Sequence, residues 1–194
     1  IKQFISWMVG CFMGRYSADK PGLIIASQGQ KVEDLDLPAM TLEIDDDGII
    51  PIILESDFFT DDMTQRIEAG MKALFGERNF YDNMKYIKAS LGQELRDYLY
   101  KDYYDDHLQM YSVKGAKRPI YWLFSSKMGD KKKKGYFKAL VYMHRMESDT
   151  LSKLHADYVS PYIDKLEQQL KEAEDDAVRD DLSQAQRNKA NKLA

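Results

Sequence analysis

Two segments rich in aromatic and β-branched residues, joined by a strongly basic loop, constrain the fold of this chain more than any other feature. The first segment is Arg118–Ser126 and the second is Gly135–Arg145. Such segments favour β-strands, and a polar connection between them favours antiparallel pairing. The connection, residues 127–134, carries five lysines, which repel one another and lose their hydration only at high cost. We therefore predict one long β-hairpin over 118–145 with an exposed basic tip.

The same hairpin gives the chain a strongly uneven charge. Residues 114–145 hold ten Lys or Arg and one Asp, a local charge of +9. Because the whole chain carries −4, the remainder carries −13. This asymmetry indicates that the basic finger faces a polyanion or an acidic surface of a partner. A solvated loop that only maintains solubility is the alternative interpretation.

Apolar residues outside the hairpin recur mostly at helical spacing. They predict four helical stretches: 1–16, 60–75 with Thr60 as N-cap, 80–99 with a break at Gly92, and a long helix that follows the capping cluster Ser148–Thr150 and is kinked at Pro161. Three short apolar runs predict additional strands: Leu23–Ala26, Thr41–Ile44 and Gly48–Leu54.

The predicted fold class is α+β, predominantly helical, with one long β-hairpin and a C-terminal helical arm. We expect a mostly helical α+β domain over 1–146 and a long C-terminal helix or helical arm over 147–194. Beyond Lys171 the sequence is nearly all polar, which is typical of a solvated helix, a coiled-coil arm or a frayed end.

Composition limits the compartment in which the chain works. The sequence has no apolar run of the ~20 residues that a membrane-spanning helix needs, and its single cysteine, Cys11, excludes an internal disulfide framework. We therefore expect a cytoplasmic protein with no membrane partner. Since the sequence does not begin with Met, we also expect it to be a fragment of a longer chain.

The sequence lacks the motifs that several classes of cofactor-binding, metal-binding and catalytic site require. The sequence has no Gly-x-Gly pair, so a dinucleotide fingerprint and a glycine-rich loop for S-adenosylmethionine are both absent, and a P-loop is absent too. Cys11 and the three histidines, His107, His144 and His155, do not have zinc-site spacing. Spacing does not exclude a Ser–His–Asp or Cys–His triad, but no nucleophile elbow is present. We predict no catalytic, cofactor-binding or metal-binding residue in this chain.

The acidic run Asp45–Asp47, followed by Gly48, suggests a calcium-binding loop, but its spacing does not match that of an EF-hand. If Gly48 is the sixth loop position, Leu54 takes the twelfth, where an EF-hand needs a bidentate Glu. An acidic turn between two short strands is therefore the better interpretation.

Six motifs occur along the chain in this order: Ile5–Ser17 (ISWMVGCFMGRYS), Asp19–Leu23 (DKPGL), Asp47–Pro51 (DGIIP), Leu95–Leu99 (LRDYL), Arg118–Ser126 (RPIYWLFSS) and Lys138–Arg145 (KALVYMHR). In these motifs and their order, roughly residues 1–165 resemble part of the PglX-type DNA methyltransferases of BREX phage-exclusion systems. The poly-Lys loop departs from the shorter turn of the family.

The resemblance implies a parent enzyme that methylates adenine in DNA with S-adenosylmethionine and takes part in phage defence. The family's Asn-Pro-Pro-Tyr type catalytic motif is absent here, so the resemblance implies a segment from the C-terminal half, downstream of the methylase core. Expected partners are double-stranded DNA, the remainder of the methyltransferase and other phage-defence proteins. The expected role is DNA binding or recognition. The alternative is an interaction or oligomerisation module that docks the methylase core or a partner defence protein.

The candidate nucleic-acid contacts follow from side-chain chemistry. Lysine is a flexible point charge suited to phosphate, whereas the planar fork of arginine suits a guanine edge. The candidates are Lys127, Lys131, Lys132, Lys133, Lys134, Arg118 and Arg145. Tyr121, Trp122 and Tyr136 could stack on an extruded base, although strand aromatics are more often part of a core.

Overall fold

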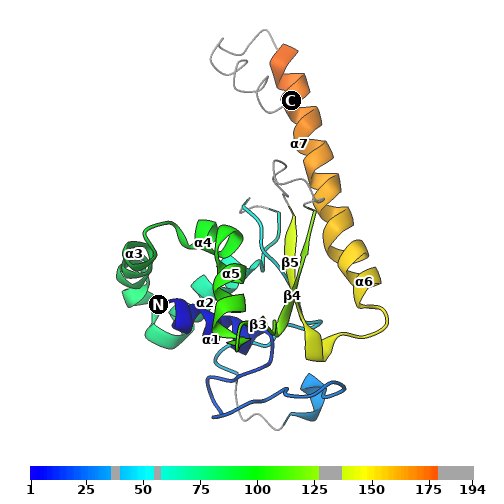
Figure 1. Ribbon diagram of the computed structural model, residues 1–194. Coiled ribbons are helices and arrows are strands. Elements are labelled where there is room, and N and C mark those ends of the chain that lie inside the picture. The colour runs from blue at the N-terminus through cyan, green and yellow to red at the C-terminus, as the bar shows by residue number, and fades with distance from the viewer. Residues whose placement is uncertain (36–39, 55–57, 127–136, 179–194) are drawn as a thin grey trace. The chain divides into compact units, whose positions relative to one another are not determined.

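A computed structural model describes residues 1–35, 40–54, 58–126 and 137–178 (Figure 1). The chain forms two compact units, Ile1–Thr150 and Leu151–Ala194. The first unit contains five α-helices and a three-stranded antiparallel sheet among its described residues, and the second is helical where it is described. The α+β, mostly helical fold class is therefore confirmed.

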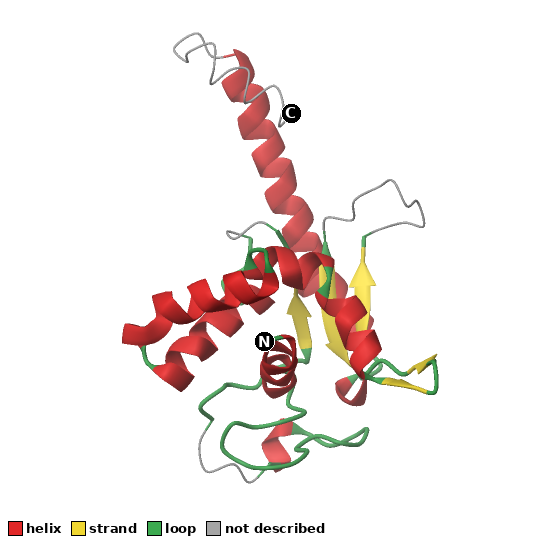
Figure 2. Ribbon diagram, turned by 60° about the vertical axis from the view of Figure 1, so that its left-hand side comes forward, coloured by secondary structure: helices red, strands yellow, loops and turns green. Residues whose placement is uncertain are grey.

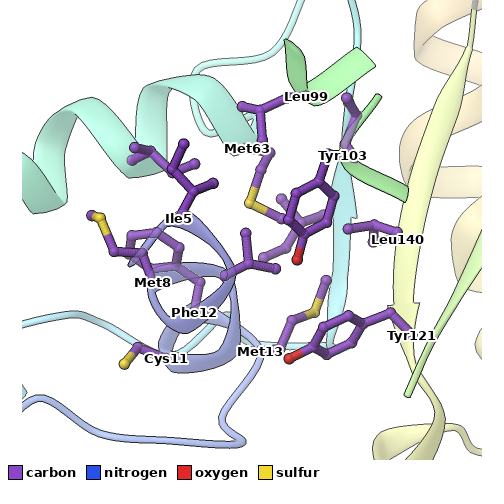
Figure 3. Packing of buried hydrophobic residues seen from close by; sticks show 14 of the residues in the cluster. Ile5, Met8, Cys11, Phe12, Met13, Met63, Leu99, Tyr103, Tyr121 and Leu140 are labelled. Atoms are coloured by element: carbon purple, nitrogen blue, oxygen red, sulfur yellow. The ribbon is translucent and has the colours of Figure 1, made fainter. Parts of the chain in front are cut away.

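Helix α1, Lys2–Phe12, lies at the centre of the first unit and is buried along most of its length. Its side chains Ile5, Met8, Val9 and Phe12 have at most 3% exposure. They belong to one core cluster with side chains of other helices and of the sheet, and Figure 3 labels Ile5, Met8 and Phe12 among them. The helix is shorter than the predicted 1–16, and the chain turns away at Gly14, whose φ of +81° is easily adopted only by glycine.

Two of the predicted short strands are wrong. Residues 23–26 form a loop, because the N–H groups of Ile24 and Ile25 donate to the carbonyl oxygens of Arg15 and Gly14 instead of to a strand. Residues 41–44 are also irregular, and the N–H of Asp45 donates to the carbonyl of Phe12 at 2.7 Å. Both segments therefore pack at the C-terminal end of α1 and are held there by backbone hydrogen bonds.

Two of the breaks between the remaining helices of the first unit fall at glycines that were predicted to interrupt them, whereas the break at Asp102 and the helix Tyr103–Met110 after it were not predicted. Gly76 ends one helix, and Gly92, with φ +73°, separates the two halves of the predicted 80–99 stretch. The helices are α2 Met63–Phe75, α3 Phe80–Leu91, α4 Leu95–Lys101 and α5 Tyr103–Met110, with 3₁₀ turns at Val32–Asp34, Glu77–Asn79 and Met143–Arg145.

The N-cap of α2 is Asp62, so the prediction of Thr60 is wrong. The Asp62 carboxylate accepts the N–H of Gln65 at 3.0 Å, and the Gln65 side chain accepts the N–H of Asp62 at 3.3 Å. This is a capping box, which satisfies two otherwise unpaired donors at once. Asp62 also binds Arg96 of α4, a contact that no local pattern reveals.

The predicted hairpin is confirmed as the main part of the sheet. Strand β4, Tyr121–Ser125, pairs antiparallel with β5, Lys138–Tyr142, and β1, Ile49–Pro51, pairs with the other edge of β5. Tyr121 is opposite Tyr142, and Ser125 is opposite Lys138. Tyr121, Leu140 and Tyr142 belong to the same core cluster as α1, and Figure 3 shows the first two. The hairpin is therefore anchored by a buried central strand.

A second, very short antiparallel pair precedes the hairpin and was not predicted. It consists of β2, Ser112–Val113, and β3, Ala116–Lys117. Figure 2 shows this pair extending beyond the end of a helix in the same unit. We call residues 112–118 the basic ribbon, because it carries Lys114, Lys117 and Arg118.

Helix α6, Thr150–Lys153, begins at the last residue of the first unit, and the chain continues in the second unit as a π-helical segment, Leu154–Val159, and then α7, Ser160–Val178. At Pro161, where a kink or restart was predicted, the chain stays helical and has just changed from the π-helical segment to α7. Among the described residues, no helix is both long and apolar enough to cross a membrane.

Candidate nucleic-acid interface

The strand register separates the predicted contact residues into two groups. The chain leaves the hairpin at Ser126 and returns at Phe137, whose carbonyl accepts the Ser126 N–H at 3.0 Å. Arg118 precedes β4 and Arg145 follows β5, so both belong to the opposite end of the hairpin. Five-residue strands separate these ends by about 15 Å. Lys127, Lys131, Lys132, Lys133 and Lys134 lie outside the described residues.

Arg145 packs against the acidic turn. Its Nη2 donates to the carbonyl of Asp46 at 2.7 Å, and its side chain lies so close to Gly48 that a Cβ there would be 3.2 Å from the Arg145 Cβ. Burial lowers the pKa of Arg145, while the carboxylates of Asp45 and Asp47 oppose that shift. Its buried Nη1 has no hydrogen-bond partner among the residues described. A guanine contact by Arg145 stays a prediction, and it would require this side chain to leave the turn.

Arg118 is in a different environment, because it is exposed at the end of the basic ribbon. Lys138, the other described cation of the hairpin, is engaged internally. Its ammonium lies 4.0 Å from the centre of the Tyr100 ring and donates to the Tyr100 carbonyl. Within the described part of 114–145, the exposed positive charge is therefore provided by Lys114, Lys117 and Arg118.

The three aromatic candidates have different environments. Tyr121 is only 1% exposed and contributes to the core, whereas Trp122, the next residue along β4, is 47% exposed. Successive strand residues face opposite sides of a sheet, which explains the difference. Tyr136 lies outside the described residues. Trp122 is thus the described strand aromatic that is available for stacking.

The acidic turn binds protein groups. The Asp45 carboxylate accepts the N–H groups of Gly48 at 2.6 Å and Ile49 at 3.1 Å. It also forms a salt bridge with Arg66 Nη2 at 2.7 Å. These contacts occupy the oxygens that a cation would need. Across the described ranges, no group of three or more His, Cys, Asp or Glu side chains could hold a metal ion.

His107 is a buried core residue. Its Nε2 accepts the N–H of Ile120 at 3.2 Å, which places the proton on Nδ1. Tyr111 and Tyr121 each lie 4.8 Å from its ring, centre to centre. Burial, assisted by the charge of Arg15, lowers the pKa of His107 to about 4. This histidine therefore stays neutral in the folded chain at ordinary pH and joins α5 to the segment before β4.

Cys11 provides a direct test of the core. Its side chain is fully buried, and burial, followed by the charge of Asp19, raises the pKa of its thiol to about 12. Because only the thiolate reacts, we expect native Cys11 to react with Ellman's reagent at least on the order of a thousandfold more slowly than in the urea-unfolded chain. Stopped-flow absorbance measures both rates. Rapid labelling without denaturant would contradict the packing around α1.

A surface hollow between α2, α3 and α4 contains further charged groups. It is lined by Glu68 and Arg96, together with Lys85 and Lys88 of α3. Burial raises the pKa of the Glu68 carboxyl. Arg96 binds Asp62, and Lys88 binds Glu94. The residues that line the hollow include members of two ion pairs, but they include no nucleophile hydrogen-bonded to a base.

Comparison with known proteins identifies homologous chains, although no family model matches the sequence. The chain is 37% identical over 197 residues to the adenine-specific methyltransferase BrxX of Escherichia coli O9:H4 (strain HS), covering 89% of this chain and 15% of that protein. It is 34% identical over 180 residues to the adenine-specific methyltransferase PglX of Lacticaseibacillus casei (strain Zhang), covering 88% of this chain and 14% of that protein.

The chain thus spans about 15% of the length of these relatives, and the match lies in their C-terminal part. The similarity extends over nearly the whole chain and agrees with the resemblance found in its motifs. The chain therefore belongs to the PglX- and BrxX-type adenine-specific methyltransferase family, of which it represents one segment.

Proposed function

We propose that this chain is a non-catalytic, DNA-contacting region of an adenine-specific DNA methyltransferase that acts in phage defence in the cytoplasm. The relatives are named as adenine-specific methyltransferases, and the segment that they share with this chain is a small part of their length. The sequence has neither a Gly-x-Gly pair nor an Asn-Pro-Pro-Tyr type motif. We therefore assign no S-adenosylmethionine contact to these residues, and place the cofactor and the catalytic motif of the proposed enzyme elsewhere in it.

The observation that carries this proposal is the concentration of charge on an anchored hairpin. The +9 of residues 114–145 stands against −13 in the remainder. The ends of the Lys-rich segment are held by β4 and by β5, the central strand of the sheet, where Leu140 and Tyr142 are fully buried. Lysines on such a support are suited to phosphate contacts, because each lysine carries a compact positive charge on a long side chain.

A charge-reversal experiment tests the proposal. The first variant replaces Lys131, Lys132, Lys133 and Lys134 with Glu. A control variant replaces four exposed cations of other segments, Lys20, Lys31, Arg78 and Lys85, with Glu and so changes the net charge equally. We expect the first variant to bind duplex DNA at least tenfold more weakly and the control to stay within about threefold. Each lost phosphate contact should reduce the log–log salt slope by about 0.9.

Fluorescence anisotropy of a labelled duplex measures both quantities, and circular dichroism verifies that each variant is folded. An equal loss of affinity in the two variants would show that only net charge matters. An unchanged affinity and slope in the first variant would defeat the phosphate-contact proposal.

A second candidate, a protein-interaction module, is favoured by the apolar stripe on α7. Ile163, Leu166 and Leu170 follow one another at three- and four-residue spacing and are 36–45% exposed. Acidic residues flank this stripe. The occupant would be the methylase core or a partner defence protein. This function predicts that the chain self-associates or binds the rest of the enzyme in size-exclusion chromatography with light scattering, while it ignores DNA at low salt.

A further inference from the structure

The basic ribbon, residues 112–118, brings three cations together within seven consecutive residues. All seven of its residues are exposed. The side chains of Lys114, Lys117 and Arg118 form no hydrogen bond or ion pair with any residue that the structure describes. By contrast, Lys2, Arg66 and Arg96 are each paired with a carboxylate. The ribbon therefore presents three cations whose charge is not neutralised by a described neighbour.

The conformation of the ribbon adds an independent observation. Its two central residues, Lys114 and Gly115, have φ of +51° and +80°. Positive φ at both positions is what a two-residue type I′ turn requires, and Asn-Gly is the preferred sequence for it. Lys114 is the one non-glycine residue with positive φ among the described residues. The chain thus has a lysine at the tip of the ribbon, in a backbone conformation that costs lysine free energy and suits asparagine better.

We propose that the basic ribbon is a second DNA-contacting element, separate from the Lys-rich segment. Two paired strands are narrow enough to enter the major groove of duplex DNA, which is about 12 Å wide. There, the two lysines would meet phosphates, and the guanidinium of Arg118 would be the group able to form two hydrogen bonds with one guanine. This inference rests on the proposed DNA-binding function.

The position of the ribbon makes it separable from the Lys-rich segment by mutation. The ribbon joins the Tyr121 end of β4, while the Lys-rich segment is attached at the Ser125 end. Sites more than about 10 Å apart usually contribute additively. Variants at the two ends should therefore weaken DNA binding by factors that multiply.

The first experiment replaces only Lys114 with Asn in the 194-residue chain. We expect Lys114→Asn to raise the urea midpoint of unfolding, because Asn-Gly suits the turn, and to weaken duplex binding about threefold. It should also reduce the log–log salt slope by about 0.9, the value for one phosphate contact. Greater stability with unchanged affinity and slope would overturn the inference. Since this variant is expected to be more stable, unfolding cannot explain a loss of binding.

A second experiment separates the inference from the function on which it rests. The triple variant Lys114→Asn, Lys117→Gln and Arg118→Gln is compared with a variant in which Lys131, Lys132, Lys133 and Lys134 become Gln. The inference expects at least a tenfold loss of affinity in the triple variant, and a further loss when both sets are combined. If only the second variant loses affinity, the inference fails and DNA binding stands. If the unaltered chain does not bind duplex DNA, both fail.

Discussion

Replacing Asp62 with Ala should destabilise the first unit by about 3–5 kcal/mol, the cost of leaving a buried charge without its partner. Asp62 is fully buried, and its carboxylate both caps α2 and binds Arg96, which is itself held by the carbonyl of Ile53 at 2.9 Å. The substitution therefore removes the α2 cap and also removes the carboxylate that binds the Arg96 guanidinium. Urea denaturation followed by circular dichroism measures the loss.

Two controls identify the source of this effect. Asp61 is adjacent in sequence, but its side chain is 52% exposed and it shares Arg66 with Asp45, so Asp61→Ala should cost less than about 1 kcal/mol. The double variant Asp62→Ala with Arg96→Met should recover part of the loss, because it removes the unpaired charge. Equal effects of Asp61→Ala and Asp62→Ala would contradict the described contact between α2 and α4.

Acid should destabilise the chain through His107. Burial lowers the pKa of His107 from 6.5 to about 4 in the folded state. Above pH 6.5 both folded and unfolded forms hold the neutral imidazole, so its contribution to stability is complete. As pH falls from 6.5 to about 4, the unfolded chain gains a proton that the folded chain does not. About 3 kcal/mol of stability is lost across this window, at about 1.4 kcal/mol for each pKa unit.

Urea unfolding at a series of pH values measures this loss. The variant His107→Gln keeps an acceptor for the Ile120 N–H but does not titrate, so its stability should fall less steeply between pH 6.5 and 4. The comparison uses the slope against pH, because the substitution also changes the absolute stability. Parallel slopes for the two proteins would show that His107 is accessible to protons in the folded state.

Sequence patterns were sufficient where the structure depends on local chemistry. The strands of the hairpin follow from their aromatic and β-branched residues, and the ends of α2 and α3 follow from Gly76 and Gly92. Each of these features needs only neighbouring residues to explain it. The fold class could therefore be predicted without knowledge of any distant contact.

Contacts between distant segments explain what the patterns did not predict. Ile24 and Ile25 look like strand residues, but their N–H groups bind the loop after α1. Asp62 rather than Thr60 caps α2, and it also serves as the partner of Arg96. Arg145 was a candidate for nucleic-acid contact, yet its guanidinium donates a hydrogen bond to the Asp46 carbonyl. The basic ribbon is too short for a strand pattern, and its turn has lysine where asparagine is usual.

The most direct test of the central claim is the salt dependence of duplex binding by the unaltered 194-residue chain. If the basic hairpin places at least four lysines on phosphates, the log of the association constant should fall with the log of salt concentration at a slope of about −3.6 or steeper. The variant with Glu at Lys131, Lys132, Lys133 and Lys134 should lose about 3.6 of this slope, so that only the contacts of other cations contribute to what remains. A slope near zero for the unaltered chain, or no binding at low salt, would contradict the claim that this segment contacts DNA.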